Sequence, residues 1–157
     1  MSRTLSILVD NKPGVLTRVT GLVARRGYNI ESLAVSITED SNRSCVTMVV
    51  DADEDVVHQV TKQLHKLINV YKVVDLTESD YVDRELVLFK VNADPSRRGE
   101  IVELVNIFRA KIVDVSQTSL TIEMTGTDDK LGAMERLLRE YGIKEIIRSG
   151  KIAIPRG

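Results

Sequence analysis

The sequence predicts an α+β protein built from two ferredoxin-like repeats, each with the order β-α-β-β-α-β. The first observation is that short aliphatic runs alternate with longer segments whose apolar residues recur every three or four positions. These patterns are typical of strands and helices respectively. The second observation is that this split βαβ order occurs twice, with a period of about 80 residues. The chain is therefore expected to have a duplicated architecture.

The first strand and the first helix have clear limits. Residues 4–9, TLSILV, form an aliphatic and β-branched run that stops at turn residues, which predicts a strand. Pro13 suits the first position of the helix that follows, where its missing N–H costs nothing. Gly27 suits the position just past the helix end, where a left-handed backbone is favoured. The buried stripe of this helix consists of Val15, Leu16, Val19, Leu22 and Val23.

A hairpin, a second helix and a last strand complete the first repeat. Residues 33–37 alternate between apolar and small side chains, and residues 44–50 form the returning strand after a polar turn. Asp53 caps the second helix, and residues 70–76 form the fourth strand. The buried stripe of the second helix consists of Val57, Val60, Leu64 and Leu67.

The second repeat follows the same order with a less regular pattern. Its strands are predicted at residues 86–91, 112–115, 120–124 and 143–148. One helix opens at Asp94-Pro95 and runs through residues 108–111, and another begins at Asp128-Asp129 and closes at Gly142. The predicted domains are residues 1–77 and 85–157, joined by a polar and acidic linker at residues 78–84.

Composition and charge exclude several classes of function. The net charge of −1 creates no general attraction for nucleic acid or anionic membranes, and aromatic residues, at 4%, are too few for base stacking on a sheet. No apolar run reaches the roughly 18 residues that a membrane span needs, and the N-terminus lacks the pattern of a signal peptide. The single cysteine, Cys45, is expected to be a small core residue in a reducing compartment. A cytoplasmic location is expected.

No catalytic or metal site is predicted. His58 and His65 lie seven positions apart on a predicted helix, which is too wide for the i, i+4 pair that holds a metal ion. The chain contains neither a phosphate-binding loop with its lysine nor a GxGxxG motif, and its acidic residues fall in turns and helix starts, where capping explains them.

The turn before the first helix is the best candidate for a binding site. The helix start at Gly14-Val15-Leu16 offers backbone N–H groups and a positive dipole end to a carboxylate, and Gly14 leaves room for a ligand. The amide oxygen of Asn11, or of Asn29, can accept from an ammonium group. Val15, Leu16 and Ile30 are candidates to enclose a small aliphatic side chain. Asn11 as an ordinary turn residue and Asn29 as a helix-end residue remain the alternative interpretation.

Three segments of the chain resemble the small, regulatory subunit of acetolactate synthase (acetohydroxyacid synthase): NKPGVLTRVTGLVARRGYNIESL, KQLHKLINVYKVVDL and RELVLFKVNADPS. The resemblance covers nearly the whole chain. It implies that the first repeat is an ACT domain, a module that binds amino acids, and that catalysis belongs to a separate large subunit with thiamine diphosphate, Mg²⁺ and usually FAD. The small subunit would activate the large one and confer feedback inhibition by valine, with leucine or isoleucine as further effectors.

The resemblance also implies where the effector binds. ACT domains pair side by side, so the site lies at a dimer interface. One chain contributes its first loop and helix start, and its partner contributes the beginning of its second strand. The implied residues are Asn11, Gly14, Val15 and Leu16 from one chain, and Asn29 and Ile30 from the other.

The second repeat departs from this pattern. Its equivalent loop, NADPSRRG, lacks the Pro-Gly-aliphatic entry, and the Gly-Tyr-Asn exit is missing too. No amino-acid site is therefore expected there, and this half is expected to contribute to association and to contact with the large subunit. A free-standing ACT-type sensor that regulates another enzyme or a transcription factor remains the alternative function. An enzyme in its own right is disfavoured by the missing catalytic groups.

Overall fold

A computed structural model describes all 157 residues of the chain, which divide into two compact units. The first unit comprises Met1–Val82 together with Lys151–Gly157, and the second comprises Asp83–Gly150. The C-terminal seven residues therefore belong to the N-terminal unit, whereas the pattern of the sequence grouped them with residues 85–150.

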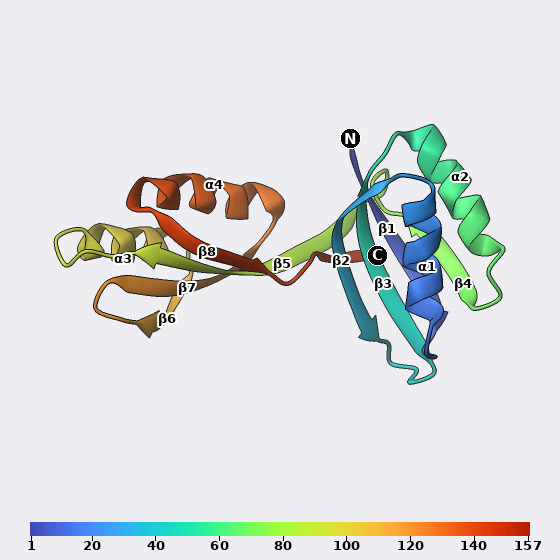
Figure 1. Cartoon of the computed structure of the whole chain (residues 1–157), viewed down its shortest axis with the longest axis horizontal. Helices are drawn as coiled ribbons and strands as arrows, with labels where there is room; N and C mark the ends of the chain where they lie inside the picture. The colour runs from blue at the N-terminus through green and yellow to red at the C-terminus, as the bar shows by residue number, and fades with distance from the viewer. The chain divides into compact units, whose positions relative to one another are not determined.

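The first unit is one antiparallel sheet with two helices on one face (Figure 1). The strand order is β2-β3-β1-β4, so β2 and β4 are the edges. Leu5, Ile7 and Met48 of the central strands are fully buried against Val19 and Val23 of the first helix, in one core cluster. Its elements are β1 (Ser2–Asp10), α1 (Val15–Arg25), β2 (Asn29–Ile37), β3 (Arg43–Asp51), α2 (Glu54–His65) and β4 (Val70–Asp75).

The second unit repeats this arrangement with strand order β6-β7-β5-β8. Phe89, Ile122 and Met134 belong to its separate core. Its elements are β5 (Tyr81–Asn92), α3 (Arg98–Ile107), β6 (Lys111–Val115), β7 (Ser119–Gly126), α4 (Asp128–Leu138), the short 3₁₀ helix η1 (Arg139–Tyr141) and β8 (Ile143–Arg148). The predicted order of elements is confirmed in both repeats.

Helix α3 differs from the prediction at both ends. It begins at Arg98 instead of Asp94, because the amides of Arg97 and Arg98 both donate to the Asp94 carbonyl, at 3.0 and 2.9 Å, in a preceding turn. It ends at Ile107 instead of continuing through residues 108–111. Arg109 adopts a left-handed φ of 56°, the conformation that Gly27 takes at 79° after α1. The second repeat thus has a left-handed helix exit without glycine, which local sequence did not indicate.

Two further differences concern segments outside the regular repeats. Strand β5 begins at Tyr81, inside the segment predicted as linker, and a ninth strand, β9 (Ile152–Pro155), pairs with β5. The remaining linker is held by Arg3, whose side chain is 4% exposed and whose guanidinium contacts Asp75 at 2.6 Å and Glu78 at 3.1 Å. The linker is therefore tied to the first strand of its own unit.

Cys45 lies on the open face of the first sheet, which corrects its prediction as a core residue. In β3, Val46 and Met48 point to the helices, so Cys45 points the other way, and it is only half buried. Because β3 has apolar residues on both faces, its sequence pattern does not indicate which way the Cys45 side chain points. Its neighbours in the pleat are Leu8 on β1 and Ser36 on β2.

Candidate functional site

The loop between β1 and α1 leaves the start of the helix open. Gly14 precedes α1 with a left-handed φ of 83°, and no side chain caps the helix. The Val15 amide reaches the Lys12 carbonyl at only 3.4 Å, and neither a side chain nor a loop carbonyl takes the amides of Leu16 and Thr17. The first turn of α1 contains no acidic residue, whereas α2 and α4 each begin with two. The positive end of α1 is therefore free to attract an anion.

Asn11 is fixed by the turn between β2 and β3. Its backbone N–H donates to the Asn42 carbonyl at 2.8 Å, and its side-chain Nδ2 donates to the Ser41 carbonyl at 3.0 Å. With the amide nitrogen engaged, the side-chain Oδ1 remains as an acceptor. An uncapped helix start and a free acceptor therefore occur in the same short loop.

A polar network behind the loop holds it in place. The Asp10 carboxylate accepts from the Tyr71 hydroxyl and, at 2.7 Å, from Asn69 Nδ2. Arg18 of α1 donates to Asn69 Oδ1 at 2.7 Å, and the Arg43 guanidinium lies 4.2 Å from the centre of the Tyr71 ring. The hydrogen bond from Tyr71, followed by that from Asn69, lowers the pKa of Asp10, and the same contact with Asp10 raises the pKa of Tyr71. Helix α1, the loop and the edge strand β4 are thus joined by one network through Asp10 and Asn69.

Sequence reasoning missed this network. Asn69 and Tyr71 are 59 and 61 residues from Asp10, and they resemble ordinary residues of a turn and an exposed strand position. Only the antiparallel pairing of β1 with β4 brings them beside the loop.

The structure brings some of the predicted site residues together and separates others. Asn11, Gly14 and Leu16 share the loop and the helix start. The Val15 side chain is only 3% exposed in the core, so it has only its backbone to contribute. Asn29 and Ile30 begin β2 at the far end of β3, because Asn29 lies opposite Asp51 and Asp10 lies opposite Arg43. One chain therefore holds the two groups of residues apart.

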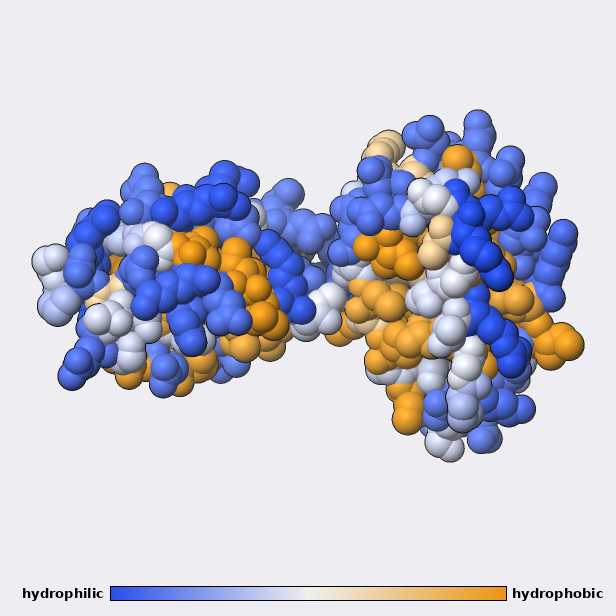
Figure 2. Space-filling view, in the orientation of Figure 1, coloured by the Kyte–Doolittle hydropathy of each residue, from blue (hydrophilic) through white to orange (hydrophobic).

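The edge strand β2 carries exposed apolar side chains. Leu33, Val35 and Ile37 are 36%, 43% and 61% exposed, and Figure 2 shows apolar surface gathered beside this strand. An exposed edge with apolar side chains offers both unpaired backbone groups and buriable surface to another strand. It is suited to association.

Ionisable side chains outside this loop form no obvious reactive centre. No group of three or more histidine, cysteine, aspartate or glutamate side chains lies close enough to hold a metal ion. His58 lies 3.9 Å from Glu54 on the exposed surface of α2. None of the helices is both long and apolar enough to cross a membrane.

Comparisons with known proteins agree on one family. Residues 84–157 match the family model "Small subunit of acetolactate synthase", and residues 5–72 match "AHAS small subunit-like ACT domain". A probable acetolactate synthase small subunit from Archaeoglobus fulgidus is 58% identical over 157 residues, which cover all of this chain and 98% of the relative. The acetolactate synthase small subunit of Mycolicibacterium smegmatis is 55% identical over 156 residues, which cover 99% of this chain and 92% of the relative.

A solved structure extends this likeness to the fold. The crystal structure of the acetolactate synthase small subunit from Thermotoga maritima is 40% identical and has a TM-score of 0.89, with coverage of 100% of this chain and 98% of that one. The resemblance expected from the three sequence segments and the predicted α+β fold class are both confirmed. The chain belongs to the family of acetolactate synthase small subunits.

Proposed function

We propose that this chain is the regulatory subunit of an acetolactate synthase and that it binds valine between two ACT domains as a feedback signal. The large subunit, with thiamine diphosphate, Mg²⁺ and usually FAD, would convert two pyruvate molecules to acetolactate and CO₂. The small subunit would activate it and make it sensitive to valine. The observation that carries the proposal is the uncapped start of α1 beside the free acceptor of Asn11.

A zwitterionic amino acid fits the chemistry of this loop. Its carboxylate would accept from the amides of Leu16 and Thr17, where no acidic side chain competes. Its ammonium would donate to Asn11 Oδ1. Leu16, whose side chain is 37% exposed, would contact a branched aliphatic side chain. The loop alone contacts the ligand from one side only.

A second copy would supply the other side. Antiparallel pairing of two β2 edges sets the Asn29 end of one strand beside the Ile37 end of the other. The Ile37 end leads into the turn that holds Asn11 through Ser41 and Asn42. Asn29 of the partner subunit would therefore lie near the open loop, with Ile30 of the partner subunit behind it. This geometry supports a site that exists only in the dimer.

Feedback requires that valine bind two states of the assembly with different affinity. Allosteric coupling of about 1–3 kcal/mol is typical, and the large subunit must then change valine affinity by the same factor. The small-subunit match over residues 84–157 favours this role over a free-standing sensor, because a sensor of the minimal ACT kind would not need that half.

Calorimetry tests the site. We expect valine to bind the dimeric chain with a dissociation constant between about 1 μM and 1 mM (about −8 to −4 kcal/mol). Asn11→Ala removes the acceptor for a charged donor and should weaken binding at least about tenfold. Asn92→Ala, which changes an exposed asparagine at the end of β5, is the matched control and should bind as the wild type does. Absence of heat with the wild-type dimer would refute the site.

Activity measurements test the regulation. The purified large subunit should turn over faster when the chain is added, and valine should reverse this gain. The chain alone with pyruvate and thiamine diphosphate should be inactive. Turnover without a large subunit would refute the regulatory role.

A further inference from the structure

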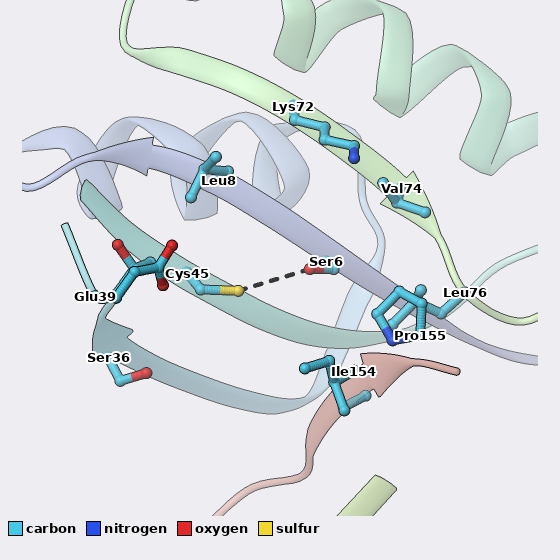
Figure 3. A pocket seen from close by; sticks show the side chains of 12 residues that line it. Ser6, Leu8, Ser36, Glu39, Cys45, Lys72, Val74, Leu76, Ile154 and Pro155 are labelled. Carbon is cyan, nitrogen blue, oxygen red and sulfur yellow. Dashed lines mark hydrogen bonds between the residues drawn. The ribbon is translucent and has the colours of Figure 1, made fainter. Parts of the chain in front are cut away.

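The face of the first sheet that lies away from the helices carries a hollow. The strand register aligns Ser36, Cys45, Leu8 and Lys72 in one row across the four strands, and Ser6 and Val74 lie in the adjacent row. Figure 3 shows these side chains on one face, with Ile154 and Pro155 of β9 beside them. The hollow has a volume of about 500 Å³, within the range of small-molecule sites.

Strand β9 forms one wall of this hollow and is anchored at both ends. The Lys151 N–H donates to Ser32 Oγ on β2 at 3.0 Å. The Arg156 N–H donates to the Asp80 carbonyl at 3.0 Å, and the Arg156 guanidinium pairs with the Asp80 carboxylate at 3.1 Å. Between these anchors, Ala153, Ile154 and Pro155 border the hollow. The wall is therefore held over the sheet although it comes from the other end of the chain.

The hollow is apolar in its middle and positively charged on one side. Leu8 lies opposite Lys72 across the β1–β4 pair, Val74 lies two residues further along β4, and the fully buried Leu76 also lines the hollow. The Lys72 ammonium has no ion-pair partner. Small polar groups of the sheet also line the hollow, among them Ser6 Oγ and Cys45 Sγ, which lie 3.6 Å apart. Glu39 is on the β2 side, three strands from Lys72.

We propose that this hollow is a second ligand site, for a small apolar carboxylate. The carboxylate pairs with the Lys72 ammonium, and the hydrocarbon chain lies over Leu8 and Val74 towards Ile154 and Pro155. Three strand spacings separate Lys72 from Ser36, a distance of about 14 Å, so an extended chain of several carbons fits along the row. Glu39 at the far side repels a second negative charge, which favours a monocarboxylate.

This site is separate from the valine site. The hollow lies on the face opposite α1, and none of its lining residues belongs to the loop at residues 11–16. A ligand here touches the sheet and β9 together, so it holds the C-terminal strand on the first unit. We expect its occupation to be independent of valine binding.

Cys45 is a built-in reporter, because it is the only cysteine of the chain and it lines the hollow. The experiment measures the rate at which iodoacetamide, an uncharged reagent, alkylates Cys45 in the full-length chain. Octanoate is expected to slow alkylation at least fivefold in a saturable way. Octylammonium and 1-octanol, which have the same hydrocarbon chain, are expected to have less than a third of this effect at equal concentration.

Two variants identify the charge that is responsible. Lys72→Met should abolish the advantage of octanoate over 1-octanol. Lys62→Met, which removes an exposed ammonium from α2 on the other face, should retain it. The thermal transition of each variant checks that the fold is intact, and saturating valine should leave the alkylation rate unchanged.

Three results would overturn the proposal. Equal protection by octylammonium and octanoate would show that charge plays no part. Full octanoate protection in Lys72→Met would remove the role of that residue. No protection by octanoate up to 10 mM, which would fill about 90% of a site with a dissociation constant of about 1 mM, would show that the hollow is not a site. None of these outcomes bears on valine binding, so failure here is distinct from failure of the regulatory proposal.

Discussion

Adding one methyl group at either end of α1 separates the conformational role of glycine from its role in binding. Gly14 and Gly27 have nearly the same left-handed φ, 83° and 79°, and beyond the adjacent residues a Cβ at either position has no heavy atom within 4 Å. Gly14→Ala and Gly27→Ala therefore introduce no clash within the chain. Each costs only the strain of a left-handed alanine, about 1–2 kcal/mol.

The two variants should lose similar stability but differ in valine binding. A loss of about 1–2 kcal/mol corresponds to a fall in melting temperature of about 4–16 °C for a domain of this size. In Gly14→Ala the new methyl group also lies where the valine carboxylate would approach the amides of Leu16 and Thr17. We expect its valine affinity to fall at least about tenfold, or 1.4 kcal/mol, while Gly27→Ala stays within about threefold of the wild type.

Urea denaturation and calorimetry at one protein concentration measure both quantities. Unchanged valine affinity in Gly14→Ala would refute the assignment of the helix start as the carboxylate site. Equal losses of affinity in the two variants would attribute the effect to the strain on α1 instead. A difference of more than about 1 kcal/mol in their stabilities would contradict the equivalence of the two conformations.

Three further predictions test other parts of the molecule. Val15→Ala should destabilise the fold by about 2–3 kcal/mol, since the side chain is buried. Leu16→Ala should cost less than about 1 kcal/mol of stability yet weaken valine binding. The reverse pattern in denaturation and calorimetry would contradict the placement of these side chains. Burial raises the pKa of Asp75, but hydrogen bonds from Arg3 and Thr77 outweigh the effect of burial, so the pKa in the folded state is lowered. This carboxylate therefore contributes stability above pH about 4 that is lost as the pH falls through the pKa of the folded state. Asp75→Asn should flatten the acid limb of a stability profile measured between pH 2 and 7. An unchanged acid limb would argue against this contribution. Val35→Lys, on the exposed β2 edge, should give monomers in sedimentation and abolish valine binding, and a variant that stays dimeric would reject the β2 interface.

Local sequence predicted most of the first unit well. The exit of α1, the hairpin of β2 and β3 and the stripe of α2 depend on turn residues and on periodicity within about ten positions, and these are properties of adjacent residues. The entry of α1 differs from its prediction, because the helix begins at Val15 after Gly14, so Pro13 lies outside it and is not its first residue. The second unit was harder to predict. Asp94-Pro95 has the composition of a helix start but forms a turn, and Arg109 makes a left-handed exit that is usually made by glycine. The backbone departs from the local preference at both places.

The sequence by itself determined the duplicated order of strands and helices, the family, and a helix start suited to a carboxylate, because each of these is encoded in short stretches of neighbouring residues. Only the tertiary structure decided what surrounds that helix start and what covers the sheet. Asn69 reaches Asp10 across 59 residues, and Lys151 reaches Ser32 across 119. The physical reason is that such contacts arise from strand pairing and chain return, and no local periodicity carries a signal for side chains that meet only after the sheet has formed.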